Sequence, residues 1–117
     1  MGKLYNHASI MEMIGNDKIE LVELMKMFVD LCPVMILEIE ESIDSGNFKI
    51  AGDVAHKLKT TVRMWEMEEI IDDIIFIEQN GKNGTKTDRL KPVFMEVKEK
   101  LNNVLSMMKK EIEETLV

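Results

Sequence analysis

Apolar residues recur every three or four positions along most of the chain, which is the spacing of one face of an α-helix. Asp17 followed by Glu20 forms a capping box, so a helix is predicted to begin there. Pro33 suits the first turn of a following helix, which is predicted to end at the segment DSGN, residues 44–47. A short amphipathic segment over residues 4–15 precedes both helices.

The second half of the chain has the same periodicity. Asn47 is a candidate cap for a long helix that ends near Trp65. A further helix begins at Glu66 and is predicted to stop at Gly81, where glycine can adopt a left-handed cap. The polar loop GKNGTKT follows, and Pro92 marks the early part of a last helix. The apolar stripe of this last helix nearly repeats by heptads and consists of Val97, Leu101, Val104, Met108 and Ile112.

Strand signals are absent from this pattern. The β-branched residues are mostly isoleucines at helical spacing, and the Asn-Gly pair at residues 83–84 lacks alternating flanks. A chain of 117 residues is long enough to bury a single core. We therefore predict one all-α domain over residues 1–117, folded as an antiparallel four-helix bundle with a short additional N-terminal helical segment.

Composition narrows the possible functions. A formal net charge of −7 argues against nucleic-acid binding, which normally needs a basic protein. The single cysteine, Cys32, excludes a disulfide framework and a cysteine-based zinc site, and its thiol is predicted to be buried. No apolar stretch approaches the ~20 residues that span a bilayer, and no signal-peptide pattern is present, so we expect a soluble cytoplasmic protein. The eleven methionines are predicted chiefly to fill core gaps, although methionine also suits adaptable binding surfaces.

His56 lies in the middle of the helix that is predicted over residues 48–65. The apolar stripe of that helix lies within roughly 60° of one direction at about 100° per residue. It consists of Ala51, Val54, Ala55, Leu58, Val62 and Trp65. His56 is about 160° from the centre of the stripe, so its side chain is predicted to face solvent.

Small and cationic residues surround the histidine on the predicted exposed face. Lys49 and Arg63 lie seven residues to either side of it, and Gly52 and Thr60 lie four residues to either side. Lys59 adds a third cation three residues after it. An exposed imidazole with open approach and nearby positive charge suits phosphoryl transfer, and an ordinary surface histidine among solvated lysines also fits.

The stretch AHKLKTT, residues 55–61, resembles the phosphorylation motif of histidine-containing phosphotransfer (HPt) domains, which is His-x-Leu-Lys followed by small residues. Residues 15–61 are also similar to that family in order: a capped helix, a second helix, a Gly/Asn break and the histidine helix. Residues 70–84 resemble the next helix of the family, with its Leu-Glu pair as Ile77-Glu78. Two positions differ from the family pattern, because Thr60 and Glu66 occur where the family usually has glycine.

This resemblance implies a phosphorelay intermediate that accepts a phosphoryl group on His56 from a receiver-domain aspartate and passes it on. Such a domain has no kinase activity, binds no ATP and needs no cofactor, because the partner receiver holds the Mg²⁺. The implied partners are a response-regulator receiver domain, a hybrid sensor histidine kinase, or both, and we expect a monomer. The resemblance implies that Lys59 supports the phosphoryl oxygens; Glu78 either orients the histidine ring or is a plain surface carboxylate. Receiver docking is expected over Lys49, Gly52, Asp53, Thr60 and Arg63.

A second interpretation also fits the sequence. An HPt-shaped interaction module that binds a receiver or another partner without carrying phosphate is the main alternative, and the two departures from the family pattern favour it. Metal sites in helical bundles need several inward histidines and carboxylates, whereas this chain has only His7 and His56, so no metal is expected. His7 is predicted to be incidental. The acidic pairs at residues 68–69, 72–73 and 113–114 are predicted to be solvated helix faces.

Overall fold

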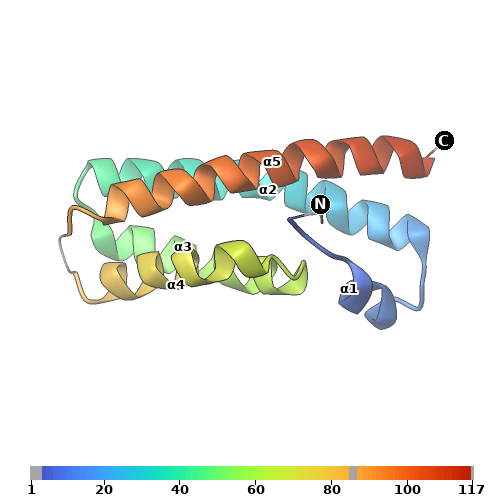
Figure 1. Cartoon of the computed structure of the whole chain (residues 1–117), viewed down its shortest axis with the longest axis horizontal. Coiled ribbons are helices and arrows are strands. Elements are labelled where there is room, and N and C mark those ends of the chain that lie inside the picture. Colours follow the sequence, from blue (N-terminus) through green and yellow to red (C-terminus); the bar gives the residue numbers. More distant parts are fainter. Residues whose placement is uncertain (1–3, 85–86, 117) are drawn as a thin grey trace.

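The computed structural model describes residues 4–84 and 87–116, and these residues form five α-helices and no strand (Figure 1). The helices are α1 (Ala8–Met13), α2 (Lys18–Asp44), α3 (Phe48–Met64), α4 (Glu68–Lys82) and α5 (Leu90–Leu116). The predicted all-helical class is confirmed for this part of the chain. Residues 85 and 86 of the predicted polar loop lie outside it.

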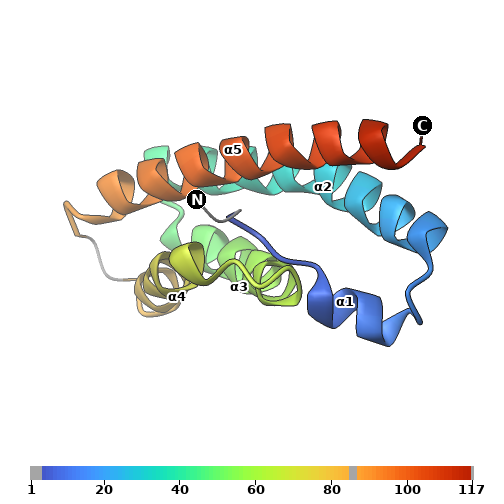
Figure 2. The same ribbon diagram turned by 45° about the vertical axis from the view of Figure 1, so that its right-hand side comes forward.

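The helices are arranged in two layers that run along one elongated body of 46 × 25 × 22 Å. In both ribbon views the long helices α2 and α5 lie side by side, and the shorter pair α3 and α4 lies across from them (Figures 1 and 2). Helix α2 contacts α3 and α5, and α4 also contacts α3 and α5. Helices α2 and α5 extend beyond the α3–α4 pair, and α1 and the segment before it lie on the side of their far ends where α3 and α4 are absent (Figure 2).

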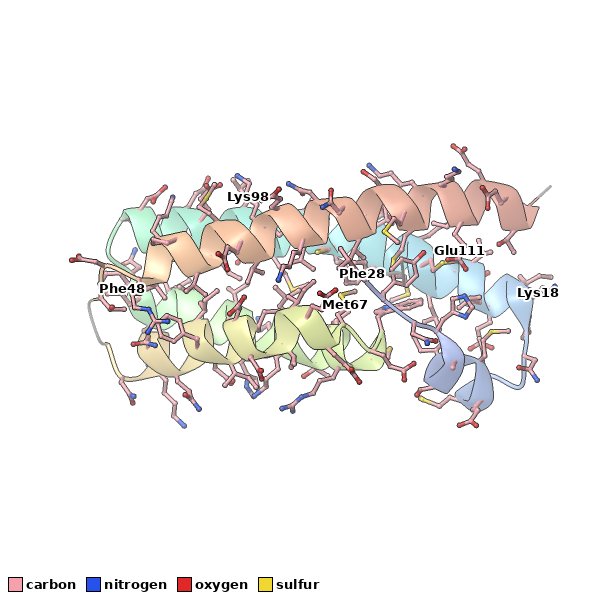
Figure 3. The ribbon with its side chains drawn as sticks, viewed as in Figure 1. Lys18, Phe28, Phe48, Met67, Lys98 and Glu111 are labelled. Atoms are coloured by element: carbon pink, nitrogen blue, oxygen red, sulfur yellow. The ribbon has the colours of Figure 1, made fainter. Side chains whose placement is uncertain are left out.

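The core lies between the two layers and contains the two apolar stripes that the periodicity predicts. All six residues of the stripe predicted over residues 48–65 and all five of the stripe in α5 are buried. Phe28 of α2 points into the same core (Figure 3), where its ring lies 6.3 Å from the ring of Trp65. The predicted burial of Cys32 is also confirmed, and burial raises the pKa of its thiol to about 12. No helix in the described ranges combines the length and apolar character that a bilayer crossing requires.

The predicted break at Pro33 is wrong, because α2 continues through it to Asp44. An interior proline costs about 3 kcal/mol, since it lacks the N–H and its ring crowds the preceding turn. Phe28, Cys32 and Ile36 nevertheless occupy one buried face on both sides of it. Burying each such side chain contributes about 1.5–3 kcal/mol, so packing favours the continuous helix. The predicted cap at Asp17 is confirmed, since its side chain accepts hydrogen bonds from two backbone N–H groups at 3.0 and 3.2 Å.

The predicted start of α3 after Asn47 is confirmed, whereas two other predicted boundaries differ. Asn47 occupies the cap position of α3, but its side chain makes no capping hydrogen bond to the helix. Helix α1 covers only residues 8–13 of the predicted segment 4–15, and the residues before it are not helical. Helix α4 runs past Gly81 to Lys82, and the left-handed glycine is Gly84, with φ of 63°.

Gly81 is instead buried inside α4, at its closest approach to α3. A Cβ atom on Gly81 would lie 2.6 Å from the Cα and the backbone nitrogen of Gly52. Real Cβ atoms essentially never come so near to backbone, so the absence of a side chain at both positions allows the two helices to touch.

Candidate functional site

His56 projects from the outer side of α3, and 64% of its side chain is exposed, as the helical periodicity predicts. Its ring nitrogen Nδ1 forms a hydrogen bond with the Oε2 carboxylate oxygen of Glu78 on α4. A carboxylate only accepts, so in the neutral ring the proton lies on Nδ1 and the lone pair lies on Nε2. The described residues give Nε2 no partner, so the site presents an oriented and accessible nitrogen nucleophile.

The same carboxylate binds a cation with its other oxygen. The Nζ of Lys59 lies 2.7 Å from the Oε1 of Glu78, and both side chains are less than one fifth exposed. The hydrogen bond from Lys59, reinforced by that from His56, holds the pKa of Glu78 below its usual range despite partial burial. Glu78 therefore stays ionised and links a lysine and a histidine of α3 to α4.

The glycine contact explains how Glu78 reaches the histidine. Helices α3 and α4 are antiparallel neighbours in contact at Gly52 and Gly81. The residue one turn after Gly52 on α3 therefore lies opposite the residue one turn before Gly81 on α4. His56 and Glu78 occupy these two positions. Backbone contact at the two glycines brings α4 close to α3, so that the Glu78 side chain can reach the His56 ring.

Four of the residues expected beside His56 are exposed on α3, namely Lys49, Asp53, Thr60 and Arg63. The expected exposure of Gly52 is wrong, because this residue is buried beneath α4. Lys59 also differs from a freely solvated cation, since only 17% of its side chain is exposed and its ammonium group contacts Glu78. The exposed face around the histidine therefore carries a mixed set of charges, and a partly buried lysine–glutamate pair lies behind it.

A cluster of polar side chains links the N-terminal segment to the last part of α5, and no motif in the sequence indicates it. The Oε1 of Glu111 accepts a hydrogen bond from the Tyr5 hydroxyl at 2.5 Å, and its Oε2 lies 2.8 Å from Nε2 of His7. Burial and this carboxylate raise the pKa of Tyr5 above its usual range. The sequence predicts His7 to be incidental, but its ring contacts Glu111 across more than a hundred residues of the chain, and no local motif marks such a contact. Across the described ranges, no group of three or more potential metal-ligating side chains is present.

Glu66 lies in the turn between α3 and α4 and has a left-handed backbone, with φ of 53°. That conformation costs a non-glycine residue about 1–2 kcal/mol. The turn begins directly after the buried Trp65, whose ring packs edge-on against Tyr5, and the Glu66 carboxylate accepts a hydrogen bond from the Ser9 N–H at 3.4 Å. Glu66 is one of the two positions at which the sequence differs from the glycine of the HPt pattern, and glycine adopts this backbone conformation at little cost.

Substitution at this turn should separate backbone strain from side-chain contact. We expect Glu66→Gly to be more stable than Glu66→Ala by about 1 kcal/mol, because both lose the contact to Ser9 and only glycine relieves the left-handed strain. Urea unfolding of the wild type and both variants measures this difference. An alanine variant as stable as the glycine variant would contradict the assignment of strain to Glu66.

Comparison of the chain with protein-family models, with curated proteins and with solved structures gives no match in any of the three cases. The resemblance to HPt domains therefore rests on the sequence motifs of this chain.

Proposed function

We propose that this protein is a phosphorelay intermediate that accepts a phosphoryl group on His56 and passes it on, without kinase activity of its own. The observation that carries the proposal is the exposed imidazole whose Nδ1 is held by Glu78, which leaves Nε2 as the nucleophile. We further propose that α2–α5 form the antiparallel four-helix bundle of an HPt domain, with α1 as the additional N-terminal segment.

The proposed reaction is an in-line transfer between a receiver-domain aspartyl phosphate and the histidine. The lone pair of His56 Nε2 attacks phosphorus, a nitrogen–phosphorus bond forms, and the phosphorus–oxygen bond to the receiver aspartate breaks to release its carboxylate. The ring becomes cationic as this bond forms, and the Glu78 carboxylate lies beside Nδ1 to stabilise that charge. The Mg²⁺ belongs to the receiver.

Two further observations support this assignment. The left-handed backbone at Glu66 occurs where HPt domains usually have glycine, which is the residue that adopts this conformation most readily, and this agreement supports the proposal. The outward face of α3 offers Lys49, Asp53, Thr60 and Arg63 as a receiver-docking surface, which we propose without the buried Gly52. The proposed partner is a receiver domain of a response regulator or a hybrid sensor kinase, and the protein would act as a cytoplasmic monomer.

The decisive experiment is incubation of the purified protein with phosphorylated receiver domains. Phosphate on histidine is labile in acid and stable in base, so transfer should give a product with that stability. The alternative is an HPt-shaped module that binds a receiver without carrying phosphate. The branched side chain of the exposed Thr60, one helical turn from His56, is the feature that favours it. Receiver binding without any phosphorylated product would support that alternative.

Lys59 should influence the transfer rate through charge. We expect Lys59→Ala to slow transfer about 10-fold, equivalent to ~1.4 kcal/mol in the barrier, because its ammonium group keeps the Glu78 carboxylate ionised and holds it in place beside the ring. Receiver affinity should change little, since most of the lysine side chain is covered. The exposed Lys57 is the matched control, and Lys57→Ala should transfer at the wild-type rate. Transfer rates and receiver affinities of the variants test this role; a wild-type rate for Lys59→Ala would contradict it.

A further inference from the structure

Two Asn-Gly pairs lie close together near the end of α4, namely Asn80-Gly81 and Asn83-Gly84. Asparagine followed by glycine is open to an intramolecular reaction, because glycine has no side chain to obstruct the approach of its backbone nitrogen to the asparagine side chain. The structure places the two pairs in different environments. The first glycine is buried within the helix, whereas the second pair is exposed at the helix end.

The Asn83-Gly84 pair has open space around it. A Cβ atom on Gly84 would meet nothing within 4 Å. The part of the chain that the structure describes gives the Asn83 side-chain amide no hydrogen-bond partner. Two backbone bonds hold the pair, from the Asn83 N–H to the Gln79 carbonyl at 3.1 Å and from the Gly84 N–H to the Gly81 carbonyl at 3.0 Å. Both bonds belong to the helix terminus, and helix ends fray, so the pair is free to leave its helical conformation.

The Asn80-Gly81 pair is the same dipeptide in a closed environment. The Asn80 side-chain amide donates a hydrogen bond to the Phe76 carbonyl at 2.8 Å. Gly81 is buried against Gly52, and its nitrogen lies within α4, where backbone N–H groups bond to carbonyls about one turn earlier. A reaction at Gly81 would require the last turns of α4 to separate from α3. Such an opening costs more free energy than fraying at a helix end.

We propose that Asn83 is a site of spontaneous deamidation, and that the fold directs this modification to Asn83 and away from Asn80. The backbone nitrogen of Gly84 loses its proton and attacks the side-chain carbon Cγ of Asn83. A carbon–nitrogen bond forms, the bond from Cγ to Nδ2 breaks, and the amide nitrogen takes up a proton and leaves as ammonia. Water then opens the resulting succinimide at either carbonyl, which gives aspartate or isoaspartate at residue 83. The reaction is additional to phosphate transfer and does not involve His56.

Either product changes the end of α4. A carboxylate replaces a neutral amide at the C-terminus of the helix, where the helix dipole favours cations and disfavours anions. Isoaspartate also lengthens the main chain before Gly84, so the Gly84 N–H cannot keep its present bond to the Gly81 carbonyl. The modified protein should therefore have a looser last turn of α4 and a more negative net charge.

Incubation of the folded protein at mildly alkaline pH, followed by peptide mapping with mass spectrometry, measures both pairs in one molecule. Asn83 should convert at least about 10-fold faster than Asn80, because the rate follows the population of the locally open state. The rate at Asn83 should rise with pH, since the Gly84 nitrogen reacts only after it loses its proton. Comparable rates at the two asparagines of the folded protein would overturn the proposal.

The same protein unfolded in guanidinium chloride is the control for the effect of the fold. Both asparagines should then convert at similar rates, because both precede glycine and α4 no longer protects Asn80. A preference for Asn83 that stays unchanged in the unfolded chain would contradict protection by the fold. So would an Asn83 that converts only when the chain is unfolded. His56→Gln should deamidate at the wild-type rate, which separates this proposal from phosphate transfer.

Discussion

Replacing His56 by glutamine is expected to abolish acceptance of phosphate from phosphorylated receiver domains. The glutamine amide keeps some polarity at this position but offers no nucleophilic nitrogen. Because most of the His56 side chain is exposed, the free energy of unfolding should change by less than about 0.5 kcal/mol. Transfer assays and urea unfolding on the same preparation measure the two effects.

His7→Gln is the matched control for this substitution, since His7 contacts Glu111 at the other end of the molecule and should not affect transfer. A His56→Gln variant that still acquires acid-labile phosphate would show that another residue is the acceptor. A variant that unfolds markedly would show instead that the imidazole has a structural role.

Gly81→Ala should destabilise the protein by about 2–3 kcal/mol, which is in the range for overpacking a tight contact. The new methyl group would lie 2.6 Å from backbone atoms of Gly52, and backbone cannot move aside as a flexible side chain can. Helix α4 would have to shift away from α3, and Glu78 would move with it. We therefore expect a weakened Glu78–His56 contact and slower phosphoryl transfer in addition to lower stability.

Urea unfolding measures the stability of this variant, and nitrogen NMR of the His56 ring measures which nitrogen carries the proton. Gln79→Ala is the control within α4, because Gln79 is exposed and alanine is a good helix former. Gly52→Ala should lower the stability less than Gly81→Ala does. A Cβ on residue 52 would lie 2.9 Å from its nearest backbone atom, whereas a Cβ on residue 81 would have a backbone atom closer than 2.6 Å. If Gly81→Ala keeps wild-type stability and the wild-type ring protonation, the close approach of the helices does not position Glu78.

The helical class, the two buried stripes and the exposure of His56 follow from the sequence alone. These properties depend on which residues lie within a turn or two of each other on one helix, and a period of 3.6 residues fixes that relation. The cap at Asp17 is local for the same reason, because the side chain bonds to backbone N–H groups of its own helix. The orientation of the imidazole is not local and does not follow from the periodicity.

The tertiary structure decides the features that depend on contacts between helices. A proline at residue 33 has a local signal for a helix start, but burial on both sides of it keeps α2 continuous. Glycine at residue 81 predicts a helix end from the local sequence, but in the structure its lack of a side chain allows the close contact with Gly52. Glu78 is 22 residues from His56, and whether it is a solvated carboxylate or the partner of Nδ1 depends on how closely α4 approaches α3. The sequence by itself therefore determines which face of α3 the histidine occupies, whereas only the packing of α4 determines which of its nitrogens is free to react.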